Sequence, residues 1–195
     1  MPRKTIEAVV EIQPFQGNLP WAVAAVGDWS FLRLFSGTTV EEIGSLILTA
    51  CSYNSHLEVQ PSAIDTLNAF VAEDFILPGG LRFSEDEQVR IVPGCCCGLE
   101  NWREWLDVPS GNIVWAGHDP SPAVEFVDGG IRVWQDEKAD GVDFIDFGVD
   151  EMRVSLEKVE ADLKGFVVGL GRWADFMAPE LKPKIIEHFA KNMNI

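Results

Sequence analysis

The sequence predicts an α+β fold in which helices pack against an antiparallel sheet, and three observations support this prediction. Apolar and polar residues alternate over 5–12, as is typical of a half-buried strand. An Asp-Gly pair lies between two alternating segments within 123–134, which indicates a β-hairpin. Apolar residues recur at steps of four and three from Met152 to Met177, which indicates one long helix. A shorter helix over about 181–193 is predicted to end the fold.

Length and composition indicate how the chain is organised. It has 195 residues, of which 47% are hydrophobic. A chain of this length and composition buries one sizeable core and is not expected to be disordered. We therefore predict a single domain over 1–195, with a C-terminal helical part from about residue 150.

Two overlapping capping boxes predict where a first helix begins. Thr38 stands three residues before Glu41, and Thr39 stands three residues before Glu42. In a capping box the hydroxyl and the carboxylate satisfy each other's backbone N–H groups at the start of a helix. The helix is expected to bury the apolar positions Val40, Ile43, Ile47 and Ala50.

Weaker local signals place the remaining elements. The apolar segment 21–35 predicts one or two strands, and a helix is expected from about Ser62. The Pro-Gly-Gly sequence at 78–80 is typical of a turn. A short strand is expected over 88–92, and an amphipathic helix, ended by Pro109, over 99–107.

The hairpin has two plausible registers. An Asp128–Gly129 loop would place Glu125 opposite Arg132, with an ion pair on one face and apolar pairs on the other. A Gly-Gly loop one residue later would place Glu125 opposite Trp134 and lose that charge pairing. We prefer the first register because it pairs opposite charges.

The chain is strongly acidic. Its 31 acidic and 15 basic residues give a net charge of −16, and residues 100–150 alone hold 12 acidic and 3 basic residues. A negative field repels phosphate backbones and anionic lipid surfaces, so we expect no nucleic-acid partner and no membrane partner. The same field favours a basic protein partner.

The most unusual chemistry is a run of three cysteines, Cys95, Cys96 and Cys97, immediately before the predicted helix at 99–107. A thiol at a helix start, with His118 as base, is one candidate for catalysis. Adjacent side chains are expected to point in different directions, and the C-x-x-C spacing of metal sites is missing. We therefore expect buried structural cysteines, no metal site, no cofactor and no catalysis.

Two further segments offer candidate binding residues. The loop 117–122 is held by two prolines and presents His118 and Asp119. The segment from residue 136 resembles a calcium loop but has Lys138 and Phe147 where ligands are required. Its carboxylates alternate with aromatic residues, which favours a docking surface for a basic partner: Asp136, Asp140, Asp143 and Asp146.

The segment 94–105, with 117–122 downstream, resembles uncharacterised small acidic bacterial proteins, similar in kind to immunity proteins of bacterial toxin systems. The resemblance implies a bacterial protein that binds another protein, and it implies no catalytic residue.

The sequence as a whole favours a non-catalytic, acidic protein-binding module that docks on a basic partner. The alternative is an enzyme or a metal-binding protein that uses the Cys95–Cys97 run with His118. The four cysteines are mostly contiguous, which is poor geometry for disulfides and fits a reducing cytoplasm. The long helical stripe would also allow a homodimer if part of it were exposed.

Overall fold

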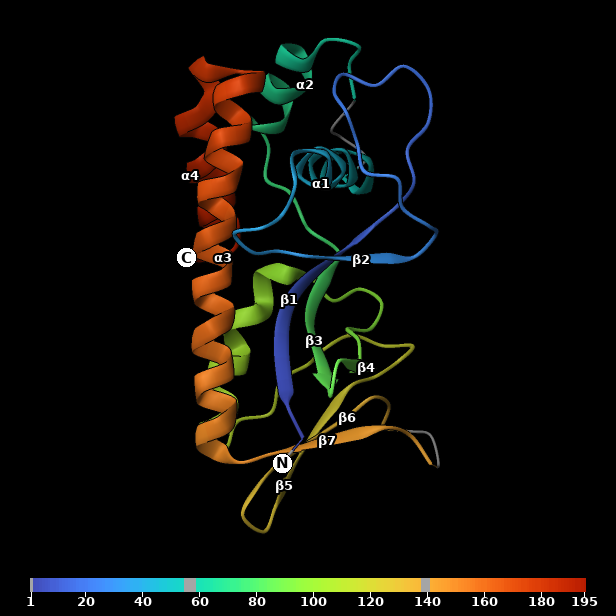
Figure 1. Cartoon of the computed structure of the whole chain (residues 1–195), viewed down its shortest axis with the longest axis vertical. Coiled ribbons are helices and arrows are strands. Elements are labelled where there is room, and N and C mark those ends of the chain that lie inside the picture. Colours follow the sequence, from blue (N-terminus) through green and yellow to red (C-terminus); the bar gives the residue numbers. More distant parts are fainter. Residues whose placement is uncertain (1, 55–58, 138–140) are drawn as a thin grey trace. The chain divides into compact units, whose positions relative to one another are not determined.

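The computed structural model describes residues 2–54, 59–137 and 141–195, and it has the predicted α+β fold (Figure 1). The chain forms two compact units: Met1–Val9 with Pro78–Ala161, and Val10–Leu77 with Asp162–Ile195. The single domain over 1–195 stays a prediction. In the described part of the chain, no helix combines the length and the apolar character needed to cross a membrane.

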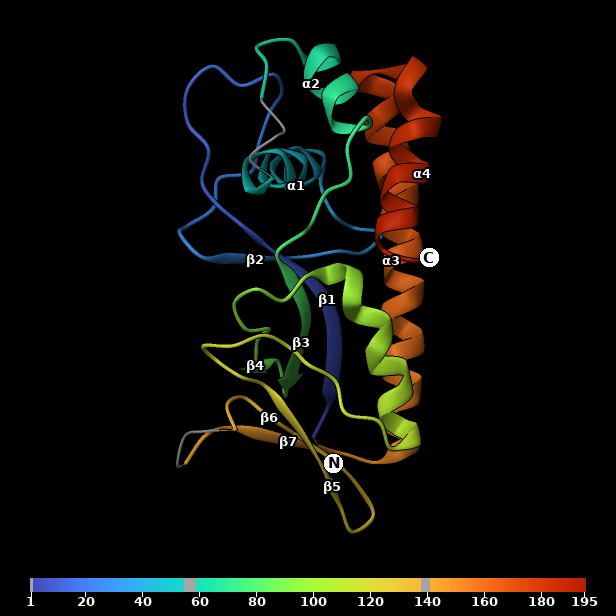
Figure 2. The same cartoon turned by 180° about the vertical axis from the view of Figure 1, so that it is seen from behind.

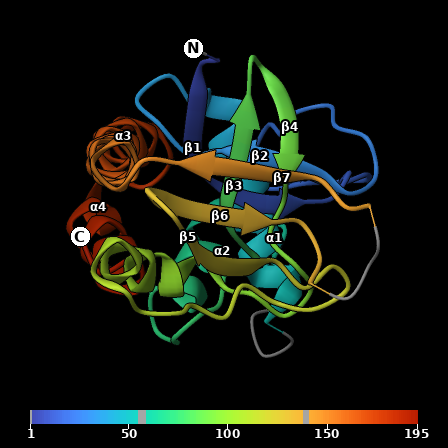
Figure 3. The same ribbon diagram turned by 90° about the horizontal axis from the view of Figure 1, so that it is seen from below.

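The first unit contains two sheets and a 3₁₀ helix. In one sheet β3 lies between β1 and β4, and in the other β6 lies between β5 and β7, as Figure 3 shows. β6 is antiparallel to both of its neighbours. The elements are β1 (Lys4–Ile12, as far as Val9), β3 (Gly79–Glu85), β4 (Gln88–Ile91), η1 (Leu99–Ser110), β5 (Ala123–Val127), β6 (Gly130–Trp134), β7 (Phe144–Phe147) and the first turns of α3 (Val149–Met177).

The β5–β6 hairpin has the preferred register, with Glu125 opposite Arg132. We expected an ion pair between these two residues, and this prediction is wrong. Arg132 instead donates two hydrogen bonds, of 2.7 and 2.8 Å, to Asp146 on β7. Glu125 accepts a hydrogen bond of 2.9 Å from the indole N–H of Trp134. The third strand, β7, therefore supplies the partner of Arg132, and the register of the β5–β6 hairpin is as predicted.

η1 is a 3₁₀ helix of 12 residues, not the predicted α-helix. Four of its five buried side chains follow a period of three, which is the repeat of a 3₁₀ helix: Leu99, Trp102, Trp105 and Val108. It also continues through Pro109, which we expected to end it. η1 runs beside the first turns of α3 (Figure 2), and Arg153 of α3 donates a hydrogen bond of 3.4 Å to the carbonyl of Pro109.

The second unit is mostly helical. Its elements are β2 (Ser30–Arg33), α1 (Val40–Tyr53), α2 (Ala63–Phe70), the later turns of α3, η2 (Pro179–Leu181) and α4 (Lys182–Asn192). Aromatic rings form much of its core: the Trp21 and Trp173 centroids lie 5.2 Å apart, and those of Phe75 and Phe189 lie 5.0 Å apart. The segment 21–35 contributes one strand, β2.

Two local predictions in the N-terminal half have different outcomes. The capping box of Thr39 and Glu42 is present at the start of α1, but Val40 is 50% exposed, so its predicted burial is wrong. Val40 lies in the first turn of α1, before the buried residues of the helix, which begin at Ile43. The turn predicted at 78–80 is also wrong, because β3 begins at Gly79.

The predicted apolar stripe on α3 is largely confirmed. Most of its positions are buried, with Phe166 buried in place of the half-buried Val167. The long helix and the shorter α4 that follows it match the predicted end of the fold. Because the stripe is buried, it does not offer the exposed face on which the homodimer prediction depended, and the homodimer stays a prediction.

Candidate functional site

Three ligand-type side chains of the first unit converge at the surface, and we name Cys95, Cys96 and His118 the Cys–Cys–His cluster. One ligand atom from each residue lies within 4.8 Å of the other two, and all three residues are exposed. The sulfurs of Cys95 and Cys96 are 3.5 Å apart. The expectation that adjacent cysteines point in different directions is therefore wrong for this pair.

A tight turn explains why the two sulfurs meet. The N–H of Cys97 donates to the carbonyl of Gly94 at 3.4 Å, so Cys95 and Cys96 are the central residues of the turn. Cys96 has φ +64°, a left-handed conformation, as the third residue of a type II turn requires. Because cysteine rarely adopts this conformation, the turn stores strain at the point where the thiols gather.

A short antiparallel contact brings His118 to the cysteines from more than twenty residues away. Cys95 and His118 exchange two backbone hydrogen bonds, of 2.6 and 3.1 Å, and the N–H of Gly94 donates to Ala116 at 2.8 Å. The two backbones are so close that a Cβ on Gly94 would lie 2.6 Å from the nitrogen of His118. Glycine at this position allows the cluster to form.

Asp119 lies beside the imidazole of the cluster. Its Oδ2 lies 3.1 Å from Nδ1 of His118, so a neutral ring that donates from Nδ1 keeps a lone pair on Nε2. Carboxylates that hold histidine ligands in this way fix the tautomer and raise the basicity of the ligating nitrogen. Asp119 was predicted as a binding residue, but not as a partner of the His118 ring.

The spacing of the cluster suits a tetrahedral ion better than a disulfide. At a Zn–S distance of about 2.3 Å, two sulfurs bound to one tetrahedral ion lie about 3.8 Å apart, close to the observed 3.5 Å. A disulfide between neighbours would join Cα atoms only about 3.8 Å apart, below the usual range. The geometry therefore favours two thiols that chelate over two thiols that oxidise to each other.

Cys97 differs from its two neighbours because it is buried. Burial, together with the charges of Glu100 and Glu104, raises the pKa of the Cys97 thiol to about 11. Burial also raises the pKa of Cys51 to about 12. Both thiols stay protonated near neutral pH. The expectation of buried structural cysteines in the run is confirmed for Cys97 and is wrong for Cys95 and Cys96, which are exposed.

The acidic residues that we predicted to form a docking surface are not all available to a partner. Asp143 pairs with Arg90 at 3.3 Å, and Asp146 is held by Arg132. Asp136 is half-buried, and Asp140 lies outside the described residues. The proposed docking surface therefore rests on fewer available carboxylates than the sequence suggested.

No family model, curated protein or solved structure matches this chain. The resemblance to immunity proteins consequently stays a prediction.

Proposed function

We propose that this protein binds a zinc-type divalent metal ion through the Cys–Cys–His cluster. The observation that carries the proposal is the convergence of two sulfurs and one imidazole nitrogen within 4.8 Å of one another. The sequence led us to expect no metal and no cofactor. The proposed site corresponds instead to the alternative hypothesis, a metal-binding protein that uses the cysteine run with His118.

The donor set supports this class of metal. Zinc accepts thiolate and imidazole ligands in tetrahedral geometry, whereas magnesium and calcium prefer oxygen. Two thiolates balance the charge of a divalent ion, and Asp119 supplies the outer carboxylate that histidine ligands usually have. Binding releases the thiol protons, so affinity should fall as the pH is lowered.

The exposure of the cluster bears on what the bound ion does. Three protein ligands leave a fourth tetrahedral position for water or another molecule. Since all three residues are exposed, that position faces solvent. We therefore propose reversible binding and exchange of the ion as the function, in preference to a closed structural site.

The proposal is tested by titrating the reduced protein with Zn²⁺ in competition with a chromophoric chelator, and by recording the absorption of the Co²⁺ form. We expect one ion per chain and thiolate-to-cobalt charge-transfer bands. Cys96→Ser and His118→Gln should each weaken binding at least about 100-fold, because each removes a ligand.

Cys97→Ala is the matched control, because it removes a cysteine of the same run that is buried and outside the cluster. It should keep the affinity of the unmodified protein. Equal losses in Cys96→Ser and Cys97→Ala, or stoichiometric Zn²⁺ binding that survives Cys96→Ser and His118→Gln, would contradict the proposal.

A second candidate function, docking on a basic protein, is favoured by the outer face of the β5–β6–β7 sheet. This outer face includes Glu125, Arg132, Trp134, Phe144 and Asp146. The guanidinium of Arg132 lies 4.0 Å from the Phe144 ring centroid, and the Trp134 and Phe144 centroids are 4.9 Å apart. Tryptophan and arginine are common among the residues that dominate binding energy at interfaces.

The charge around this outer face suggests the sign of the partner. Residues 123–147 hold 7 acidic and 2 basic residues, and Arg132 is neutralised by Asp146. A partner that co-purifies through this face should dissociate as salt is raised, and Trp134→Ala should weaken it further. Retention that is equal at low and high ionic strength would exclude electrostatic docking.

A further inference from the structure

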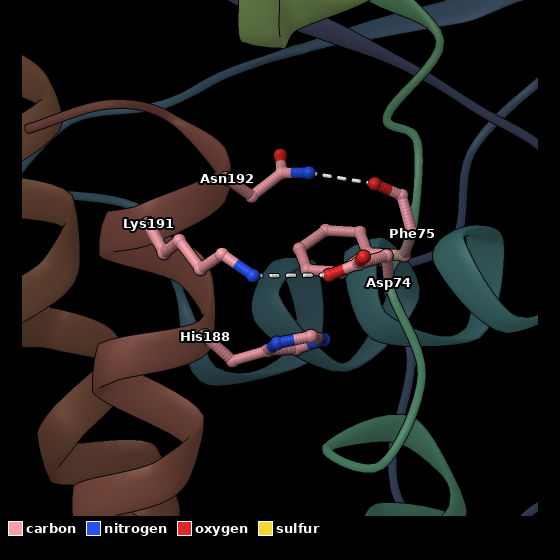
Figure 4. Close-up of a pocket in the computed structure, with 5 residues that line it drawn as sticks. All are labelled: Asp74, Phe75, His188, Lys191 and Asn192. Carbon is pink, nitrogen blue, oxygen red and sulfur yellow. Dashed lines mark hydrogen bonds and ion pairs between the residues drawn. The ribbon is translucent and has the colours of Figure 1, made fainter.

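Two surface features differ in whether their polar groups have partners. A pocket in the helical unit is lined by residues of α4 and of the segment after α2, and two of its donors are engaged (Figure 4). Lys191 pairs with Asp74 at 3.3 Å, and the amide of Asn192 donates to the carbonyl of Phe75 at 2.6 Å. The second feature, the outer edge of β5 in the other unit, has backbone groups that are not engaged in this way.

The hydrogen-bond pattern of the β5–β6–β7 sheet identifies the free backbone groups of β5. Gln135, directly after β6, donates its N–H to the carbonyl of Asp143, directly before β7, at 2.9 Å. Alternate residues of a strand bond to opposite neighbours, so Arg132, three positions before Gln135, bonds to β5 and not to β7. Because Arg132 lies opposite Glu125, the N–H and C=O groups of Glu125 are used within the sheet.

Val124 and Phe126, on either side of Glu125, therefore direct their backbone groups away from β6. β5 has one neighbour in its sheet, and at this edge neither residue has a hydrogen bond to any other residue that the structure describes. The turn end of the hairpin projects beyond the neighbouring elements of its unit (Figure 1), and a Cβ on Gly129 there would meet no atom within 4 Å. An open strand edge is a template for the addition of another strand.

The side chains along this edge indicate what an added strand carries. Phe126 lies opposite the buried Ile131 on one face of the sheet, but it is itself 45% exposed because β5 is the edge strand. Val124 shares this face, whereas Glu125 is exposed on the other. An added strand would therefore place apolar residues beside Val124 and Phe126 and a residue of the opposite face beside Glu125.

The charge at the edge selects the residue beside Glu125. Residues 119–131 hold three acidic residues and no basic one, and the carboxylate of Glu125 accepts a hydrogen bond of 2.9 Å from the neutral indole of Trp134. Glu125 would form a non-hydrogen-bonded pair with the added strand, where side chains are closest, so a lysine or arginine is favoured there.

A second copy of β5 fits this edge poorly. The antiparallel register that joins all the free backbone groups of two such strands places their Glu125 carboxylates opposite each other, which is unfavourable. The net charge of −16 on each chain adds to the repulsion.

We propose that the outer edge of β5 binds an extended segment of a basic protein, in which basic and apolar residues alternate, as an antiparallel fourth strand. The inference rests on the second candidate function, docking on a basic protein, and it assigns the segment of the partner that binds. Apolar residues of the segment exchange backbone hydrogen bonds with Val124 and Phe126 and cover the Phe126 ring, and a basic residue pairs with Glu125.

Binding is tested on the whole chain with a seven-residue peptide in which lysine alternates with valine, acetylated and amidated at its ends. Hydrogen exchange of the backbone amides is followed by NMR. The amides of Val124 and Phe126 should exchange slowly only when the peptide is bound. The amide of Glu125 should be protected with and without the peptide, because it already bonds to β6.

Two N-methylated peptides of equal charge separate pairing at the edge from general electrostatic attraction. Methylation of the valine nitrogens removes the N–H groups that face β5, and it should weaken binding at least about tenfold. Methylation of the lysine nitrogens of the backbone removes N–H groups that face away from β5, and it should change the affinity by less than about twofold.

Variants of the protein test the side-chain contacts. Phe126→Ala should weaken the unmethylated peptide about tenfold, because it removes the apolar surface that the peptide covers. Val89→Ala is the matched control, because Val89 is 49% exposed and lies on β4, the edge strand of the other sheet. It should keep the affinity of the unmodified protein. Glu125→Gln should weaken binding and reduce its dependence on salt.

Four results would overturn the proposal: no protection of the Val124 and Phe126 amides, equal losses with the two methylated peptides, equal losses in Phe126→Ala and Val89→Ala, or a dimer of the free chain that the peptide dissociates. The last result would mean that a second copy occupies the edge. Equal losses on methylation with salt-dependent binding would reject the edge and keep docking on a basic protein. Peptide binding that is the same at low and high salt would instead reject the docking function on which the proposal rests.

Discussion

Replacing Gly94 with alanine tests how the Cys–Cys–His cluster is assembled. The new Cβ would lie 2.6 Å from the backbone nitrogen of His118 and 2.8 Å from the carbonyl carbon of Gly117, whereas ordinary contacts begin at 3.4 Å. Both neighbours are backbone atoms, which cannot move aside as a flexible side chain can. The carbonyl oxygen of Pro120 would lie closer still, so the two segments must separate by more than 0.8 Å, which is the difference between 3.4 and 2.6 Å for the His118 nitrogen.

This separation should weaken metal binding while keeping every ligand. Ligand groups have to be held within about 0.5 Å of their productive positions, and in catalytic sites a misplacement of about 1 Å costs on the order of 100-fold in rate. We expect Gly94→Ala to lower Zn²⁺ affinity about 10- to 100-fold in the competition titration. Overpacking should also lower the free energy of unfolding by about 1–3 kcal/mol.

Gly148→Ala is the control, because its Cβ would meet only the Cβ of Glu151, at an ordinary 3.8 Å. It should bind Zn²⁺ like the unmodified protein. A folded Gly94→Ala variant with unchanged Zn²⁺ affinity would refute the reasoning, since the close approach of the two segments would then not position the cluster.

Three further substitutions test the partner of His118, a buried thiol and a helix cap. Asp119→Asn should weaken Zn²⁺ binding about 10- to 100-fold while the cobalt–thiolate bands persist, because it removes the partner of His118 and no ligand; unchanged affinity would contradict that role. Burial raises the pKa of Cys51 from 9.0 to about 12, so only the unfolded thiol ionises from about pH 9 upward, and the free energy of unfolding should fall by up to about 1.4 kcal/mol per pH unit. Cys51→Ala should lose this part of the slope in denaturant titrations from about pH 9 to 10.5, and an unchanged slope would count against the burial argument. Thr39→Ala should lower the free energy of unfolding by about 0.5–2 kcal/mol through loss of the α1 capping box, and thermal unfolding indistinguishable from that of the unmodified protein would show that the cap contributes nothing.

The predictions that held depended on short-range rules. The hairpin register followed from Asp128–Gly129 and the alternation on either side, and the start of α1 followed from the spacing of Thr39 and Glu42. Both rules act within a few residues, so the sequence alone carries enough information for them.

The predictions that failed did so either because a partner is distant in the chain or because a local spacing fits two periods. Arg132 pairs with Asp146 because β7 returns beside β6, a contact that the hairpin sequence does not contain. The Trp-rich helix was assigned a period of 3.6, although the spacing of Leu99, Trp102 and Trp105 equally fits the period of three that it adopts.

Predicting the Cys–Cys–His cluster requires both local sequence patterns and contacts between segments distant in the chain. Its residues were named from the sequence, but their convergence depends on the left-handed Cys96 and on the backbone contact with 116–118. Non-glycine residues rarely adopt this conformation, so nothing local predicted it.

X-ray absorption at the zinc edge of the Zn²⁺-loaded protein identifies the atoms that bind the ion. We expect two sulfur ligands at about 2.3 Å and at least one nitrogen ligand at about 2.0–2.1 Å. A coordination shell made only of oxygen and nitrogen would place the ion on the acidic surface instead and would contradict binding by Cys95 and Cys96.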